Sequence, residues 1–224
     1  MSAISSHPTD PTPDGPVFDE AFRDRLAALL RWRRDVRWFR RDPLPDGLLD
    51  RLLDAACLAP SVGNSQPWRF VLVEDAARRA AVRASFESCN AEALAGYDGE
   101  QARLYAGLKL AGLDDAPVQL AVFCNEGTDT GHGLGRRTMP ETLRYSTVAA
   151  VQTLWLAARA EGVGLGWVSI LDPDAVTRDL AVPAGWSLVA YLCLGYPRQP
   201  SDEPELVRTG WQGRDPAARA LLRR

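Results

Sequence analysis

Three short segments, far apart in the chain, carry residue types suited to binding a planar, phosphorylated ligand. Residues 33–37 (Arg-Arg-Asp-Val-Arg) place three guanidinium groups around one carboxylate. Arginine holds phosphate through two parallel hydrogen bonds, so such a cluster is typical of a phosphate site. Residues 59–68 form a loop rich in polar residues, Pro and Gly, and residues 164–170 form a glycine-containing strand that ends near the hydroxyl of Ser169. The three segments predict one shared pocket.

The same side chains also have structural explanations that need no ligand. The arginines can form a solvated basic helix end, with Asp35 as their ion-pair partner. Ser61 can be a turn or capping serine, and Ser169 can be a structural hydroxyl at the end of a buried strand. The residues alone leave both interpretations open.

The composition is that of an ordinary soluble globular protein. The chain has 224 residues, of which 46% are hydrophobic and 25% are charged. It is long enough to bury a substantial core as one large domain rather than two small ones, and no linker or internal repeat divides it. The formal net charge of −3 gives no electrostatic footprint for nucleic acid.

The cysteines and histidines predict no metal site. The four cysteines occur singly, and no pair has the spacing of metal ligands. Cys57, Cys124 and Cys193 lie in apolar runs and are predicted to be buried thiols in a reducing cytoplasm, whereas Cys89 lies in a polar helical stretch. The two histidines are too few and too scattered to bind a metal ion.

The ends of the chain are predicted to lie outside the core. Residues 1–16 are rich in Pro, Ser, Thr and Asp and lack an apolar run, which predicts a disordered leader rather than a signal peptide. Residues 17–224 are expected to form the domain, with a polar extension from Pro197 that contains Trp211 and is expected to wrap a partner subunit. No apolar run is long enough to span a membrane.

Hydrophobic periodicity predicts helices that alternate with strands in a layered α/β arrangement. The helix over residues 143–161 is apolar almost all round, so it must be buried on several sides, and a central helix in a dimer meets this requirement. No G-x-G-x-x-G follows a strand and no P-loop is present, so Rossmann and nucleotide-triphosphatase folds have no support. Helices are also predicted over residues 18–34, 76–94 and 172–180, and from an N-cap at Asp46 to Ala56; strands are predicted over residues 69–73, 118–124, 163–170 and 186–194.

Taken in order, these segments resemble the nitroreductase-like flavoproteins and, within that family, the branch of 5,6-dimethylbenzimidazole synthases. The resemblance runs from about Arg31 to Trp211. Besides the three segments above, it rests on residues 108–110, 134–136, 145–148, 150–164, 194–196 and 203–206. It implies an α+β nitroreductase-like fold with a mixed β-sheet flanked by helices, in a homodimer with two FMN sites at the subunit interface.

The resemblance also implies roles for individual residues. The arginines hold the FMN phosphate and ribityl tail, Ser61 touches the flavin from the other side, and Leu108 (in isolation a core leucine) belongs with Lys109 to a lid. Asp35 and Ser169 are the implied catalytic residues: Asp35 faces the reactive flavin and oxygen, and Ser169 hydrogen-bonds a flavin nitrogen or a peroxide oxygen. The implied cofactor contacts are Arg33, Arg34, Asp35, Val36, Arg37, Ser61, Leu108 and Ser169.

The implied reaction consumes the flavin itself. Reduced FMN and O2 are converted to 5,6-dimethylbenzimidazole and erythrose 4-phosphate in a dry pocket, and a separate flavin reductase supplies the reduced FMN. Two alternatives remain. The polar pair Asn64 and Ser65 favours the first alternative, an NAD(P)H-dependent nitroreductase or dehalogenase with permanently bound FMN. A non-catalytic flavin-binding or storage protein would bind FMN without fragmenting it.

Overall fold

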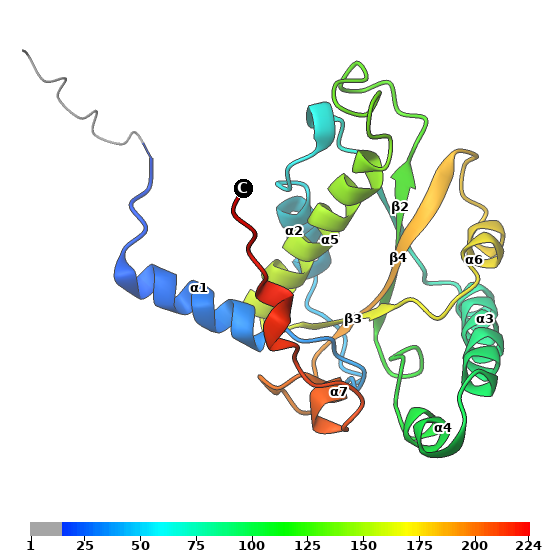
Figure 1. Cartoon of the computed structure of the whole chain (residues 1–224). Helices are drawn as coiled ribbons and strands as arrows, with labels where there is room; N and C mark the ends of the chain where they lie inside the picture. Colours follow the sequence, from blue (N-terminus) through cyan, green and yellow to red (C-terminus); the bar gives the residue numbers. More distant parts are fainter. Residues whose placement is uncertain (1–14) are drawn as a thin grey trace, which may run out of the picture.

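The fold of residues 15–224, the part of the chain that the computed structural model describes, is built around one sheet of four strands in the order β1-β2-β4-β3 (Figure 1). The predicted leader, residues 1–16, therefore lies almost wholly outside the described residues. The strands are β1 (Trp68–Leu72), β2 (Val118–Asn125), β3 (Gly164–Val168) and β4 (Trp186–Gly195). The helices are α1 (Glu20–Trp32), α2 (Leu48–Ala56), α3 (Ala76–Ala95), α4 (Gly99–Ala106), α5 (Thr142–Ala160), α6 (Pro173–Asp179) and α7 (Glu205–Arg208), with short 3-10 turns η1 (Val62–Asn64) and η2 (Pro216–Arg219).

Helices cover the sheet on both faces, which Figure 1 shows as three layers. Leu120 and Val122 of β2 face a buried cluster shared with α2 and α5. Ala121 and Phe123 face a second cluster shared with α3 and α6. Because strand side chains alternate between faces, a strand covered on both sides consists of continuous apolar residues. Cover on both faces therefore explains the apolar run over residues 120–124.

The predicted α+β arrangement of a sheet flanked by helices is observed, with a difference in strand direction. All three pairs of neighbouring strands are antiparallel. Among the described residues, parallel pairing occurs only as a single bridge between Asp35 and Leu165. The sheet is therefore mixed only through this bridge, which brings residues 33–37 to the outer edge of β3.

The predicted helices and strands agree with the observed bounds to within about two residues, the usual uncertainty of element ends. The N-cap of α2 was predicted wrongly: Gly47, not Asp46, holds this position, with a left-handed φ of 72°. The amide of Leu48 instead donates to the carbonyl of Pro45 at 3.1 Å, in a turn that only glycine enters easily. α4 lies in a stretch for which periodicity predicted no element.

The cysteines divide into exposed and buried thiols. Cys124 and Cys193 are buried, as predicted, and burial raises the pKa of Cys193 to about 12. Cys57 was predicted to be buried but is exposed, because it caps the C-terminus of α2 beyond the buried face of that helix. The buried thiols are therefore packing residues.

Two helices leave apolar side chains exposed. α1 has no buried residue and projects from the body of the molecule (Figure 1). Its Phe22, Leu26 and Leu30 are 37%, 40% and 49% exposed. α5 is buried along one side, but Tyr145 and Val148 on its other side are 59% and 39% exposed. The prediction that α5 is buried on several sides is thus only partly confirmed within one chain.

Two further observations concern residues 15–224. None of the helices in this range combines the length and hydropathy that crossing a bilayer requires. The same range contains no group of three or more His, Cys, Asp or Glu side chains arranged to bind a metal ion.

Candidate functional site

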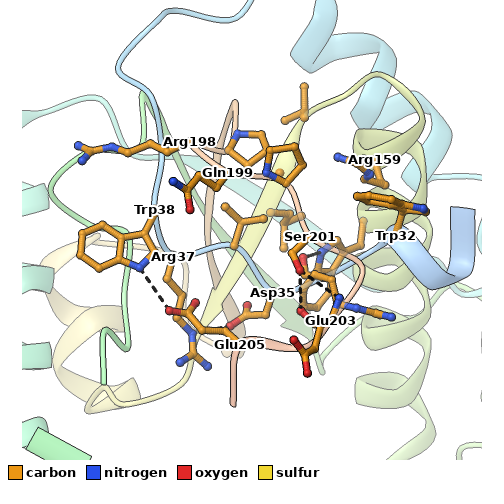
Figure 2. A pocket seen from close by; sticks show the side chains of 18 of the residues that line it. Trp32, Asp35, Arg37, Trp38, Arg159, Arg198, Gln199, Ser201, Glu203 and Glu205 are labelled. Carbon is orange, nitrogen blue, oxygen red and sulfur yellow. Dashed lines mark hydrogen bonds and ion pairs between the residues drawn. The ribbon is translucent and has the colours of Figure 1, made fainter. Parts of the chain in front are cut away.

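A cavity of about 320 Å³ lies where the end of α1, the start of β3, the C-terminal half of α5 and residues 197–208 meet (Figure 2). Its volume falls within the range of small-molecule sites, about 300–1,000 Å³. The charged and aromatic side chains that line it are Arg34, Arg37, Arg159, Arg198 and Arg208; Asp35, Glu203 and Glu205; and Trp32, Trp38 and Trp155. Because guanidinium groups outnumber carboxylates, the wall favours an anionic ligand.

The cavity floor forms because residues 33–37 lie directly against β3. α1 ends at Arg33, whose backbone is extended, and the chain then pairs with the strand. The amide of Val36 donates to the carbonyl of Leu165 at 3.0 Å. A Cβ atom on Gly166 would collide with the carbonyl oxygen of Val36, so this approach requires glycine. The structure thus brings two of the three segments from the sequence analysis together.

Asp35 lies in this floor with its carboxylate fixed by two donors. The amide of Trp167 donates to Oδ1 at 2.9 Å, and Nε of Arg37 donates to Oδ2 at 2.8 Å. The side chain of Asp35 is nevertheless 33% exposed, whereas that of Arg37 is 12% exposed. Nη1 of Arg37 donates in turn to the carbonyl of Lys109 at 3.0 Å. Asp35 is therefore the ion-pair partner of one arginine and also an oriented carboxylate in the cavity wall.

Arg33 and Arg34 form a cationic corner beside the floor. Arg34 donates from Nε to the carbonyl of Asp202 at 2.8 Å and from Nη1 to the carbonyl of Arg33 at 2.7 Å. The guanidinium of Arg33 lies 4.6 Å from the ring centroid of Trp155. Burial, followed by the positive charges of Arg33 and Arg214, lowers the pKa of Arg34. A bound anion would relieve this repulsion.

The arginines of the wall differ in whether a carboxylate already neutralises them. Arg37 is paired with Asp35, and Arg198 is paired with Asp115 at 3.1 Å. Arg34, Arg159 and Arg208 form no ion pair with any residue in the range 15–224. These three cations are thus available to an anionic group.

The other expected site residues lie at different distances from the cavity. Leu108 is half-buried and does not line the cavity, but its neighbour Lys109 accepts the hydrogen bond from Arg37 and places its ammonium 4.5 Å from the ring centroid of Trp38. Ser169 is exposed one residue beyond β3, near Trp167, whose amide holds Asp35. Lys109 therefore borders the floor, whereas neither Leu108 nor Ser169 lines the cavity.

Ser61 is not brought to the arginine segment within one chain. Its Oγ accepts from the amide of Gln66 at 3.0 Å, which is the turn role considered for it. The next residue, Val62, donates to Oγ of Ser146 near the start of α5. Trp155, which contacts Arg33 and Arg34, lies about 14 Å further along the same helix. Ser61 and residues 33–37 therefore sit toward opposite ends of α5.

Several wall residues had no assigned role in the sequence analysis. Trp155 and Arg159 lie four residues apart on one face of α5, and Nε1 of Trp155 donates to the carbonyl of Arg34 at 3.2 Å. Glu205 and Arg208 lie on α7, in the tail that was expected to wrap a partner subunit. The sequence did contain a signal for Trp155 and Arg159, because they are spaced to lie on one face of a helix. Glu205 lies in the segment 203–206 that carries the family resemblance, but neither it nor Arg208 was assigned a role there.

The donor set fits a planar group that carries a phosphate. Three tryptophan rings line the cavity, three arginines without carboxylate partners among the described residues lie beside them, and an oriented carboxylate lies in the floor. Aromatic and apolar walls with a few placed polar groups are the usual composition of a cofactor site.

Comparisons with known proteins agree with a site for a planar, phosphorylated group. The model of the family described as "Nitroreductase family" matches residues 30–196. A 5,6-dimethylbenzimidazole synthase of Rhodospirillum rubrum is 61% identical over 202 residues, covering 90% of this chain and 96% of its own. One of Rhodobacter capsulatus is 54% identical over 195 residues, covering 87% and 94%. The crystal structure of oxidized iodotyrosine deiodinase bound to FMN and 3-iodo-L-tyrosine matches with a TM-score of 0.66 and 28% identity, over 79% of this chain and 91% of that one.

Proposed function

Because this chain belongs to the nitroreductase family, we propose that it is a 5,6-dimethylbenzimidazole synthase whose substrates are reduced FMN and O2. The proposed products are 5,6-dimethylbenzimidazole and erythrose 4-phosphate. The observation that carries the proposal is the 61% identity to a synthase along 96% of that protein's length. The oriented carboxylate of Asp35 in a cavity suited to a phosphorylated ligand adds independent physical support.

The phosphate of FMN is proposed to bind at the cationic side of the cavity. Arg33 and Arg34 form the corner, and Arg208 also lines the cavity. Val36 and Arg37 are proposed to flank the ribityl chain. Arg37 is already paired with Asp35, so its part is to orient that carboxylate and to border the flavin. Arg34 and Arg208 remain as the direct phosphate donors.

Replacing Arg208 by Ala is expected to weaken FMN binding about tenfold, which is about 1.4 kcal/mol. Riboflavin, which lacks the phosphate, should bind equally well to both proteins. The measurement is titration of each flavin by calorimetry. Arg144→Ala is the control, because Arg144 pairs with Glu126 and does not line the cavity. An equal loss for both flavins would assign Arg208 a structural role instead.

Asp35 and Ser169 are proposed to act on the reacting part of the flavin, which supplies the electrons for O2 when bound. Asp35 accepts a proton there or orders the ribityl hydroxyls, and its two donors keep one carboxylate orientation throughout. Ser169 donates a hydrogen bond at the same edge. Leu108 and Lys109 cover this edge and exclude water, which would favour simple reoxidation of the flavin.

A second copy of the chain is proposed to complete the site. α1 has 13 residues, none buried, and a helix of this length is marginal in water without a packing partner. Its apolar stripe and the exposed Tyr145 and Val148 of α5 form the surface that a homodimer would cover. In that dimer the loop that contains Ser61 would reach the flavin bound by the other subunit.

Leu26→Glu is expected to shift the protein from dimer to monomer, because it buries a charge in the proposed interface. Sedimentation velocity measures the change. The matched control is Asp24→Lys, which alters charge on the opposite face of the same helix. A wild-type protein that sediments as a monomer at micromolar concentration would contradict the proposed dimer.

The reaction also requires a source of reduced flavin. We propose a separate flavin reductase in the cytoplasm as the supplier. All four cysteines are free thiols, as expected in a reducing compartment.

An NAD(P)H-dependent nitroreductase or dehalogenase is the second candidate. It is favoured by the polar pair Asn64 and Ser65 and by the similarity to the iodotyrosine deiodinase structure. Flavin absorbance separates the two. When air is admitted to reduced FMN and the protein, a synthase leaves the flavin permanently bleached, whereas a nitroreductase returns the spectrum of oxidised FMN.

A further inference from the structure

The stretch from Tyr97 to Leu113 borders the Asp35 edge of the cavity through Lys109, which contacts Arg37 and Trp38, although none of its residues lines the cavity. It contains α4 and, beyond that helix, the irregular residues 108–112, in which the carbonyl of Lys109 accepts from Nη1 of Arg37 at 3.0 Å. Among the named elements of the described chain, α4 packs only against α3. Residues 97–113 are called the cover segment below. Because α4 has so few packing partners, a small number of contacts decides how firmly the cover segment is held at the Asp35 edge of the cavity.

The inner end of the cover segment is anchored in the core. The buried Gln119 donates from Nε2 to the carbonyl of Leu113 at 2.8 Å and accepts from the hydroxyl of Tyr191 at 2.7 Å. A Cβ atom on Gly112 would collide with the ring of Phe39. Leu113 is thus fixed by a buried hydrogen-bond chain, and movement of the cover segment must occur at its outer end.

The outer end is held by the C-terminal tail through an aromatic cluster. The ring of Trp211 lies edge-on to Tyr97 at 5.5 Å between centroids and to Tyr105 at 5.9 Å. Tyr97 and Tyr105 are 5.0 Å apart, and the hydroxyl of Tyr105 donates to Asn90 of α3 at 2.9 Å. Edge-to-face aromatic pairs stabilise beyond the area they bury. No other tryptophan contacts these two tyrosines within the described chain.

Trp211 is also tied to the cavity wall. Its amide donates to the carbonyl of Leu206 at 2.9 Å, inside α7. The same helix contributes Glu205 and Arg208 to the cavity, and Glu205 accepts from Nε1 of Trp38 at 3.3 Å (Figure 2). Glu205 lines the cavity and Trp211 contacts the cover segment, and these two residues are only six positions apart in the chain.

We propose that Trp211 is a positioning residue that holds the cover segment, and through it Lys109, against the Asp35 edge of the cavity, and thereby sets how the reaction with O2 is partitioned. This inference rests on the proposed function. With the cover segment held, water is kept from the reduced flavin and fragmentation proceeds. With the cover segment released, the reduced flavin passes two electrons and two protons to O2, which yields oxidised FMN and hydrogen peroxide.

The test compares wild type, Trp211→Ala and the conservative Trp211→Phe. Hydrogen exchange in the flavin-free protein is the first readout, and the expected result is roughly tenfold faster exchange of the α4 amides in Trp211→Ala, restored by Trp211→Phe. The second readout is hydrogen peroxide formed per reduced FMN consumed, expected to rise at least about threefold in Trp211→Ala while FMN affinity stays within about twofold. Trp186→Ala, which removes a half-buried tryptophan at the far end of β4, should change neither readout.

Unchanged α4 exchange in Trp211→Ala would overturn the proposal, as would faster exchange with an unaltered product ratio. If the wild-type protein forms hydrogen peroxide and no benzimidazole, the proposed function fails instead. The exchange data then still decide whether Trp211 holds α4, so the two failures are distinguishable.

Discussion

Replacing Asp35 by Asn is expected to lower benzimidazole formation at least about a hundredfold while FMN affinity changes less than about tenfold. Asparagine has the same shape and keeps an oxygen for the amide of Trp167, now 2.9 Å from Oδ1. It cannot accept a proton as a carboxylate does, and it loses the charge that holds Arg37. Product yield under single turnover, with FMN affinity measured separately, checks both parts.

Ser169→Gly is expected to give the same pattern, because both residues are proposed to act on the same edge of the flavin. Asp42→Asn is the matched control for the charge change, since Asp42 pairs with Arg40 on the surface and away from the cavity. Full product yield in both Asp35→Asn and Ser169→Gly would remove the catalytic roles and leave Asp35 as an ion-pair partner only.

Gly166→Ala is expected to abolish FMN binding and to destabilise the protein by about 1–3 kcal/mol. The added methyl group would collide with the backbone carbonyl of Val36, which cannot swing aside as a flexible side chain does. Relief requires residues 35–37 to leave β3, which breaks the hydrogen bonds from Val36 to Leu165 and from Trp167 to Asp35. Urea denaturation and FMN titration measure the two effects.

Gly96→Ala is the control for this substitution. Gly96 has a φ of −84°, and an added Cβ would lie 3.4 Å from the carbonyl oxygen of Ala93, an ordinary contact, so alanine fits there. Normal FMN binding by Gly166→Ala would contradict the claim that contact between residues 33–37 and β3 builds the site.

The sequence predicted the elements well because their burial is simple. β2 is apolar from Leu120 to Cys124 since helices cover it on both faces, and α2 shows one buried stripe of Leu48, Leu52 and Ala56. The N-cap of α2 was wrongly predicted at Asp46 because Gly47 completes a turn with Pro45, and turn geometry competes with side-chain capping.

The candidate site was predictable only in part. The arginine cluster and Asp35 were visible as residue types, and Gly166 was a sign that some backbone approaches β3 closely. The sequence did not show that residues 33–37 are the backbone that approaches β3. It also did not show that α7 returns to the cavity. The contact between Trp155 and Arg34 joins positions 121 residues apart, so no local pattern encodes it.

The most direct test of the proposed function is the mass of the product. Purified protein is mixed with chemically reduced FMN in air, and the small molecules are analysed by mass spectrometry, with a sample lacking protein as the control. A product with the mass of 5,6-dimethylbenzimidazole, formed only with protein, is the predicted result. Intact FMN with hydrogen peroxide alone would contradict the synthase function, and oxidation of NAD(P)H by the flavoprotein would then be the activity to measure.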